Sequence, residues 1–229
     1  MEGRPLDRPL IWINCAISAD GRLAYAEGRR ARLSSPEDLE RVHRLRAHSD
    51  AILVGIGTVL LDDPGLGVDW EQIGEAERPG PVRLVVDSRG RTPASARVVD
   101  GRAPTLLLTT RSGASHAPPG IPTVVAGERR VDLAEAFRAL RDRGIERILV
   151  EGGGEIIASL LGEGLFDRWT VYMAPCVIGG RSAPPVVAGE DRVPGTPSLP
   201  LRLRSAERLA DGLLLTWEPA APHGVGRSL

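Results

Sequence analysis

The sequence predicts an α/β domain with a mostly parallel central sheet, flanking helices and a C-terminal antiparallel hairpin. Up to residue 168, short runs rich in β-branched residues alternate with helical patterns, which is typical of a sheet covered by helices. After residue 168 this alternation stops, and the last two apolar runs turn at Asp211-Gly212 as a hairpin does. No linker divides the 229 residues, so we expect a single domain over residues 1–218 and a disordered tail over residues 219–229.

Nine short apolar runs are the expected strands. The first covers residues 10–17 and ends at a turn formed by residues 18–21. The others cover residues 50–55, 82–87, 105–109, 122–126, 147–150, 169–175, 202–209 and 212–218. Residues 69–81 and 111–120 are rich in polar residues, glycine or proline, so we expect loops there.

The clearest helix pattern opens at Ser35. This serine is a suitable N-cap, and Pro36 fits the first helical position. Leu39, Val42 and Leu45 are spaced as an apolar stripe that would face the core. Further helices are expected at residues 58–64, 132–143 and 154–161.

Charged residues on the first helix have two expected positions. Arg41 and Arg44 are typical of a solvated face, whereas Arg46, near the helix end, is the one expected to turn inward. The histidines show no spacing typical of metal ligands, so we expect neutral surface roles for all of them. They are His43, His48, His116 and His223.

Composition excludes several function classes. The net charge of −1 gives no overall attraction to nucleic acid or to an anionic membrane, so neither is an expected partner. Cys15 and Cys176 lie in apolar runs and predict buried free thiols rather than a disulfide scaffold or a metal site. The N-terminus lacks the apolar segment of a signal peptide, and no apolar run approaches ~18 residues. We therefore expect a cytoplasmic protein.

Residues 151–154, Glu-Gly-Gly-Gly, lie between an expected strand and an expected helix. Such a turn exposes backbone N–H groups at the positive end of the helix, and glycines let a phosphate approach them closely. The sequence is neither a GxGxxG fingerprint nor a P-loop, so a phosphate cradle and a purely structural turn both stay open. Glu151 would repel a phosphate, which indicates that it faces a substrate or a nicotinamide instead.

Thr58 and Asp62 are four residues apart and share one helix face. That face would present a hydroxyl and a carboxylate to a polar ligand. Taken alone, the spacing favours a structural interpretation, in which Thr58 caps the helix and residues 62–64 end it. No Ser-His-Asp arrangement or nucleophile elbow is present in the sequence.

Together these segments resemble one family. Residues 14–24 read Asn-Cys-Ala-Ile-Ser-Ala-Asp-Gly-Arg-Leu-Ala, which is similar to the N-x-A-x-S-x-D-G-[KR]-x-A opening of the riboflavin-pathway reductase family. Further segments of the family follow in its order, and the resemblance spans residues 9–218. These segments are residues 45–47, 50–55, 58–60, 62–64, 66, 86–88, 150–154 and 174–180.

The resemblance implies a dihydrofolate reductase-like fold and an NADPH-dependent reductase, active as a homodimer on a 5-phosphoribosylamino-pyrimidine whose ribosyl group becomes ribityl. The deaminase signature H-x-E…P-C-x-x-C is absent, so we expect a stand-alone reductase. By resemblance, NADPH would be held by Ala16, Thr58, Asp62, Ser88, Gly152, Gly153, Gly154 and Glu155. Substrate would be held by Arg46, Leu66 and Glu151, and Glu151 or Asp62 would assist proton delivery to the imine nitrogen.

The chain departs from the family on the substrate side. Residues 67–69 read Gly-Val-Asp where the family has Thr-x-Arg, so an arginine that normally holds substrate is replaced by Asp69. The family also differs at Arg30 and Arg32. Either Arg30 or Arg32 supplies the lost positive charge, or the site accepts a different substrate; an Arg30–Asp69 ion pair is a further interpretation. For the 2′-phosphate of NADPH, Arg89 and Arg111 are the candidate ligands.

Other functions stay open at this point. One is a reductase of the same fold that acts on a pterin, a folate or another pyrimidine. Another is a non-catalytic NADPH-binding module. The sequence does not distinguish a pyrimidine before deamination from one after it.

Overall fold

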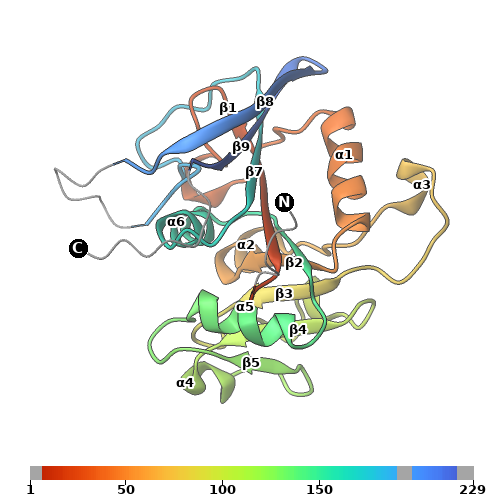
Figure 1. The fold of residues 1–229 in the computed structure, drawn as a ribbon, viewed down its shortest axis with the longest axis vertical. Coiled ribbons are helices and arrows are strands. Elements are labelled where there is room, and N and C mark those ends of the chain that lie inside the picture. The colour runs from red at the N-terminus through yellow and green to blue at the C-terminus, as the bar shows by residue number, and fades with distance from the viewer. Residues whose placement is uncertain (1–6, 190–197, 221–229) are drawn as a thin grey trace.

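The computed structural model describes residues 7–189 and 198–220. Within them the chain forms a nine-stranded sheet in the order β5-β4-β3-β2-β6-β1-β7-β9-β8 (Figure 1). The strands from β5 to β7 run parallel, and β9 and β8 join antiparallel, which confirms the predicted fold class. The strands are β1 (Leu10–Ser18), β2 (Ala51–Gly55), β3 (Val82–Val86), β4 (Thr105–Thr109), β5 (Thr123–Val125), β6 (Arg147–Val150), β7 (Arg168–Ala174), β8 (Leu201–Leu209) and β9 (Gly212–Pro219).

Helices and short 3-10 turns connect these strands. The helices are α1 (Pro36–Ala47), α2 (Ile56–Asp62), α3 (Trp70–Ile73), α4 (Arg111–Ala114), α5 (Leu133–Arg141) and α6 (Gly154–Gly162). The 3-10 turns are Ala26–Gly28 and Arg97–Val99. Helices α3 and α4 lie inside segments predicted to be loops. Each begins at a residue whose side chain accepts a helix amide, Asp69 for α3 and Thr110 for α4, and such short capped turns leave little periodicity in a sequence.

The position of β6 decides where a ligand can bind. β6 pairs with β1 on one side and with β2 on the other, although the three strands are far apart in sequence. Because parallel strands end at the same edge, the turn after β6 opens between the ends of β1 and β2. A crevice at this edge is where open α/β sheets bind ligands.

The core consists of aliphatic side chains on both faces of the sheet. On one face, α5 and α6 cover the sheet, and Phe137, Leu140 and Leu160 are fully buried. On the other face, Ile52 and Val85 pack with Leu66 and their neighbours. α5 begins at Asp132, whose side chain accepts the Glu135 amide, as its sequence predicts.

Helix α1 begins as predicted, but a different face of it is buried. Ser35 Oγ accepts the Asp38 amide at 3.2 Å. Leu39, expected in the core, is 46% exposed, whereas Asp38 is 1% exposed. Arg41 Nη2 donates to Asp38 Oδ1 at 2.7 Å and to Asn14 Oδ1 at 2.8 Å, so its placement on a solvated face is wrong. A buried ion pair, which no apolar stripe reveals, sets the orientation of this helix.

Three smaller predictions also need correction. Cys15 is buried, but Cys176 is exposed. The C-terminal hairpin turns at Ala210 and Asp211, with Ala210 at a φ of 53°, and Gly212 already belongs to β9. Of the expected tail, Pro219 ends β9, and residues 221–229 lie outside the described residues. No helix in residues 7–189 and 198–220 is long and apolar enough to cross a membrane.

Candidate active site

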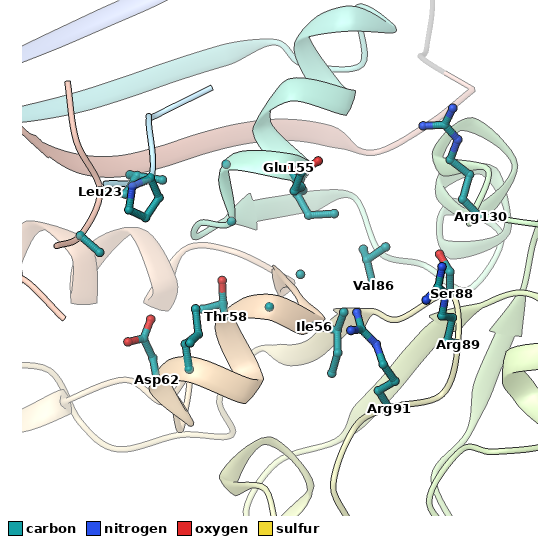
Figure 2. A pocket seen from close by; sticks show the side chains of 18 of the residues that line it. Leu23, Ile56, Thr58, Asp62, Val86, Ser88, Arg89, Arg91, Arg130 and Glu155 are labelled. Atoms are coloured by element: carbon teal, nitrogen blue, oxygen red, sulfur yellow. The ribbon is translucent and has the colours of Figure 1, made fainter. Parts of the chain in front are cut away.

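A cavity of about 620 Å³ opens at the carboxyl edge of the sheet, between α2 and the start of α6 (Figure 2). Gly153, Gly154 and Glu155 line it from the turn after β6, and Thr58 and Asp62 line it from α2. Figure 2 shows Thr58 and Asp62 at one end of this cavity and Arg89, Arg91 and Arg130 at the other.

The turn after β6 suits a phosphate group. Gly152 and Gly153 have φ angles of 103° and 90°, which residues with a Cβ rarely adopt. Gly153 is the N-cap of α6 and offers no side-chain acceptor, so its side chain cannot cap the first amides of this nine-residue helix. These amides and the positive end of the helix dipole make this turn a suitable anion cradle.

Glu155 brings a carboxylate to this cradle, but its side chain is held by another segment. Glu155 Oε1 accepts the Gly189 amide at 3.3 Å. The residue therefore offers its backbone amide to a ligand at the first turn of α6 while its carboxylate binds the chain after β7.

Four arginines line the opposite end of this cavity. Arg89 and Arg91 follow β3, and Arg129 and Arg130 precede α5. None of the four forms a salt bridge within the described part of the chain, although Arg130 lies close enough to Glu163 to act on its pKa. This end of the cavity is therefore a strongly positive site for an anion.

Ser88 connects the two loops that carry these arginines. Its Oγ accepts the Val131 amide at 3.1 Å. Ser88 also lines the cavity, so it both faces a ligand and fixes the loop after β5 beside the loop after β3.

A second cavity of about 270 Å³ continues from the first. The two share Leu23, Thr58, Asp62 and Gly153, so Thr58 and Asp62 lie at their junction. Other residues around the second cavity come from β1, α1 and the end of β6. They include Asn14, Ala16, Leu39, Val42, Arg46, Glu151 and Gly152.

Arg46 and Glu151 form a two-fold ion pair beside this second cavity. Nε donates to Oε1 at 2.7 Å and Nη2 donates to Oε2 at 2.6 Å. Burial alone would lower the pKa of the Arg46 guanidinium, but the charge and hydrogen bonds of Glu151 outweigh burial and raise this pKa. The prediction that Arg46 turns inward is confirmed. Its Nη1 also donates to the carbonyl of Gly67 at 2.7 Å.

Asp62 is the carboxylate at the junction of the two cavities. Partial burial raises its pKa above the ordinary value, and the nearby charge of Arg30 opposes this rise. Gly55, not Thr58, is the N-cap of α2, so the interpretation of Thr58 as a cap is wrong. Thr58 and Asp62 face the cavity together, as their four-residue spacing predicts.

A third cavity of about 480 Å³ lies beyond Arg46, which lines both it and the second cavity. Leu66, His43 and Arg97 line the third cavity. His43, expected at the surface, is half-buried, and its Nδ1 accepts the Asp69 amide at 2.9 Å. Burial is the main cause that lowers the pKa of His43, and the charge of Arg46 adds to it. No sequence pattern pointed to Arg97 as a residue of this site.

A model of the RibD C-terminal domain family matches residues 9–215. The chain belongs to the RibD C-terminal domain family. A relative from Archaeoglobus fulgidus is 39% identical over 218 residues, which cover 91% of this chain and 97% of the relative. A relative from Methanothermobacter thermautotrophicus is 40% identical, over 92% of this chain and 98% of the relative. Both are named 2,5-diamino-6-ribosylamino-4(3H)-pyrimidinone 5′-phosphate reductase.

Solved structures show the same fold. The deaminase/reductase of Thermotoga maritima superposes with a TM-score of 0.79 at 24% identity, and the match covers 93% of this chain and 57% of that one. The riboflavin biosynthesis reductase of Saccharomyces cerevisiae superposes with a TM-score of 0.73 at 21% identity, over 96% of this chain and 93% of that one. The chain thus spans little more than half of the Thermotoga protein and nearly all of the yeast one.

The structure also explains a motif of the family whose role the sequence left open. The Asp20 carboxylate accepts the Ser18 hydroxyl at 2.6 Å and the amides of Ile178 and Gly179 at 3.0 and 2.8 Å. These hydrogen bonds, the one from Ser18 first, lower the pKa of Asp20 to about 2. In this member of the family, Asp20 ties the end of β1 to the segment after β7.

The site residues proposed from the sequence of this RibD C-terminal domain can be grouped by the cavity that they line. The first cavity is lined by Ser88, Gly154 and Glu155, and the second by Ala16, Arg46, Glu151 and Gly152. Both of these cavities are lined by Thr58, Asp62 and Gly153. The third cavity is lined by Leu66. Arg30 and Arg32 line none of these three cavities.

One expected arginine contact is not formed, and one candidate phosphate ligand lies at a different cavity. Asp69 Oδ1 accepts the Gln72 amide at the start of α3, and the charge of Arg30 acts on Asp62, so the Arg30–Asp69 ion pair is not present in the described residues. Of the two candidate ligands for a 2′-phosphate, Arg89 lines the first cavity and Arg111 does not.

Proposed function

We propose that this protein is an NADPH-dependent reductase that converts the ribosyl group of 2,5-diamino-6-ribosylamino-4(3H)-pyrimidinone 5′-phosphate to ribityl in riboflavin biosynthesis. The observation that carries this proposal is the pair of adjoining cavities that place a phosphate cradle and an arginine cluster next to the Arg46–Glu151 pair. Two relatives at 39% and 40% identity, matched over nearly their whole length, bear that substrate in their names.

The first cavity fits the phosphates of NADPH. The amides at the start of α6, with Gly152 and Gly153 before them, would hold the pyrophosphate. The cluster formed by Arg89, Arg91, Arg129 and Arg130 would hold the 2′-phosphate, since one guanidinium group can donate two hydrogen bonds to the oxygens of a phosphate. NADPH would supply a hydride from its nicotinamide to C1′ of the open-chain imine of the substrate.

The junction of the first and second cavities is where we place the reaction. Ala16 and Thr58 would lie against the nicotinamide, and the Arg46–Glu151 pair would hold the pyrimidine. Alignment of donor and acceptor in a confined site supplies much of the rate enhancement of such a transfer.

Reduction of the imine to an amine also needs one proton on the imine nitrogen. Asp62 is our proposed proton donor, because it lies at the junction and its raised pKa favours the protonated carboxyl. Both oxygens of Glu151 already accept hydrogen bonds from Arg46, so we propose that Glu151 positions the substrate instead.

We further propose that the protein is a cytoplasmic homodimer that pairs through the C-terminal strands. β8 is an edge strand of the sheet, and edges with unpaired backbone groups readily pair with another chain. Leu199, Leu203 and Leu213, on or next to β8 and β9, are 41%, 48% and 47% exposed. A Leu203→Glu variant is expected to halve the mass measured by light scattering, and an unchanged mass would place the interface elsewhere.

The test of the function is loss of NADPH absorbance with two substrates offered side by side. One is the 2,5-diamino-4-oxo pyrimidine and the other is the deaminated 5-amino-2,4-dioxo pyrimidine, both as ribosylamino 5′-phosphates. Faster oxidation with the diamino compound supports the proposal. Oxidation of NADPH with the deaminated compound alone would mean that deamination comes before reduction. NADPH binding without oxidation by either would favour another heterocycle or a non-catalytic module.

A further inference from the structure

Arg97 lies at the third cavity, 28 residues beyond the position at which the family's arginine is replaced by Asp69. We propose that Arg97 binds the 5′-phosphate of the substrate and supplies the positive charge that is lost where Asp69 replaces the family's arginine. This inference rests on the proposed function, since it concerns the phosphate end of that substrate. It replaces Arg30 and Arg32 as the source of the charge.

The backbone of Arg97 is fixed on both sides. Its N–H donates to Asp63 Oδ1 at 2.8 Å, and its carbonyl accepts Arg83 Nη1 at 3.0 Å. The next residue, Val98, is fully buried in the core. The start of the Arg97 side chain is therefore held in place, so little flexibility of the loop has to be lost when a ligand binds.

The guanidinium of Arg97 lies over Gly65. A Cβ added to Gly65 would come within 2.9 Å of Arg97 Nη2, so a side chain at residue 65 would make the guanidinium shift from its present position. Gly65 directly precedes Leu66, the predicted substrate contact, and both line the third cavity. Arg97 is thereby placed next to the segment from which the family's arginine would reach the substrate.

Arg97 is available to an anion, whereas Arg46 is already paired. Arg46 and Arg97 are the two arginines that line the third cavity. Arg46 is neutralised by Glu151 at 2.6 Å. Arg97 makes no salt bridge with any residue in the described ranges 7–189 and 198–220. A phosphate dianion would gain most from the cation that has no partner.

The acidic residues at this cavity do not cancel that charge. The Asp69 side chain accepts the Gln72 amide, and its own amide donates to His43 Nδ1. Because Nδ1 is an acceptor, the neutral His43 ring carries its proton on Nε2 and offers a second donor to a phosphate. Glu71 and Glu77 are exposed, where water and salt screen their repulsion.

The placement of the second and third cavities agrees with this assignment. Arg46 lines both the second and the third cavity. A substrate with its pyrimidine and C1′ in the second cavity would extend its phosphate past Arg46 into the third, toward Arg97. Arg30 does not line the third cavity, and its charge acts on Asp62 instead.

The first experiment is a binding titration that needs no turnover. Ribose 5-phosphate is titrated calorimetrically into the protein saturated with NADP⁺, with ribose as the reference ligand. We expect Arg97→Ala to weaken ribose 5-phosphate binding at least tenfold, Arg97→Lys to weaken it less, and Arg102→Ala to leave it unchanged. Arg102 is the matched control, because it is an exposed arginine of the same segment that lines none of the three cavities.

The second experiment measures selectivity. Turnover of the phosphorylated substrate is compared with turnover of its dephosphorylated form, and Arg97→Ala should reduce the ratio of their kcat/KM values at least tenfold with the KM for NADPH unchanged. An unchanged ratio and unchanged ribose 5-phosphate affinity in Arg97→Ala would overturn the inference. If Arg30→Ala weakened ribose 5-phosphate binding instead, Arg30 would be the residue that binds the phosphate. If neither pyrimidine is reduced, the proposed function fails, while the titration still decides whether Arg97 binds a sugar phosphate. Melting temperatures of all variants show whether each is folded.

Discussion

Arg46 and Glu151 are 105 residues apart in the chain, yet they form the most tightly bound charge pair at the candidate site. Two donor–acceptor distances of 2.7 and 2.6 Å join the guanidinium to the carboxylate, and the two side chains are 17% and 11% exposed. The pair connects the end of α1 to the end of β6. It therefore fixes the proposed substrate side of the site against the glycine turn that follows Glu151.

The first prediction concerns Glu151→Gln. The amide keeps the shape of the side chain but loses its charge and turns one acceptor into a donor that faces Arg46. We expect kcat to fall by about two orders of magnitude, as for loss of a group aligned with the reacting atoms. The dissociation constant of NADPH, measured by fluorescence, should change less than about twofold.

The control for Glu151→Gln is Glu40→Gln. Glu40 pairs with Arg44 on the exposed face of α1, with side chains 42% and 49% exposed. Exposed pairs contribute about 0–1 kcal/mol, so this variant should resemble the wild type in turnover and in stability. Wild-type turnover in Glu151→Gln as well would remove Glu151 from the mechanism.

The second prediction concerns Asp62→Asn. If Asp62 delivers the proton, the wild-type kcat falls as pH rises through its raised pKa, because the protonated carboxyl is lost. Asparagine should lower kcat about 100-fold and remove that part of the pH profile. A profile of unchanged shape in the variant would assign the proton to another group.

Asp62→Asn should lower the activity, but it should leave the stability of the folded protein unchanged or raise it. A carboxyl whose pKa is raised on folding makes the folded state less stable as pH rises from the unfolded pKa through the folded one. Above both values Asp62 is charged and this cost is complete. Asp62→Asn should therefore unfold at an equal or higher urea concentration at pH 7, so lost activity cannot be attributed to lost folding.

Much of the fold follows from the sequence because its elements carry local signals. β6 (Arg147–Val150) has the predicted bounds, and Ser35 and Asp132 are the predicted caps of α1 and α5. Such signals depend on neighbouring residues in the chain, so they can be recognised without knowledge of the tertiary structure. α3 and α4, with four residues each, have too few positions for a period to show.

The candidate site was predicted in part for a similar reason. The inward turn of Arg46 and the shared face of Thr58 and Asp62 follow from helix positions. Three other contacts join segments that are distant in sequence or lack any pattern. They are the Asp38–Arg41 pair with Asn14, the contact of His43 with Asp69 and the approach of Arg97 to Gly65. Polar pairs of this kind have no periodicity, and only the folded chain brings them together.

The third prediction concerns the coenzyme. Replacing both Arg89 and Arg130 by alanine removes two guanidinium groups from the proposed 2′-phosphate site. We expect the KM for NADPH to rise at least tenfold, which is about 1.4 kcal/mol, and the KM for NADH to change little. Arg111→Ala is the control, because Arg111 lines a different cavity. Equal effects on both coenzymes would contradict a role in 2′-phosphate binding.

The fourth prediction concerns Asp20→Asn. The carboxylate accepts from Ser18, Ile178 and Gly179, and its pKa is lowered to about 2. A lowered carboxyl pKa gives stability that is present above the unfolded value and is lost as pH falls through the folded value, so the wild type should lose stability between about pH 4 and pH 2. In Asp20→Asn the urea midpoint should be lower at pH 7 and should depend less on pH in that window. An unchanged dependence would assign the acid transition to other carboxyl groups.

The last prediction concerns Gly153→Ala, with Gly162→Ala as its matched control at the other end of α6. Gly153 has a φ of 90° and a ψ of 103°, so a methyl group would force the cradle to change conformation, at a cost of roughly 1–3 kcal/mol. A Cβ there would lie 3.5 Å from Thr58 Oγ1, an ordinary contact, so the cost comes from the backbone and not from a clash.

A Cβ on Gly162 meets nothing within 4 Å, and alanine there should be neutral or stabilising by up to about 1 kcal/mol. We expect Gly153→Ala to lower both the melting temperature and the affinity for NADPH, measured by calorimetry, while Gly162→Ala keeps both; wild-type NADPH affinity in Gly153→Ala would show that the amides at the start of α6 do not hold the pyrophosphate.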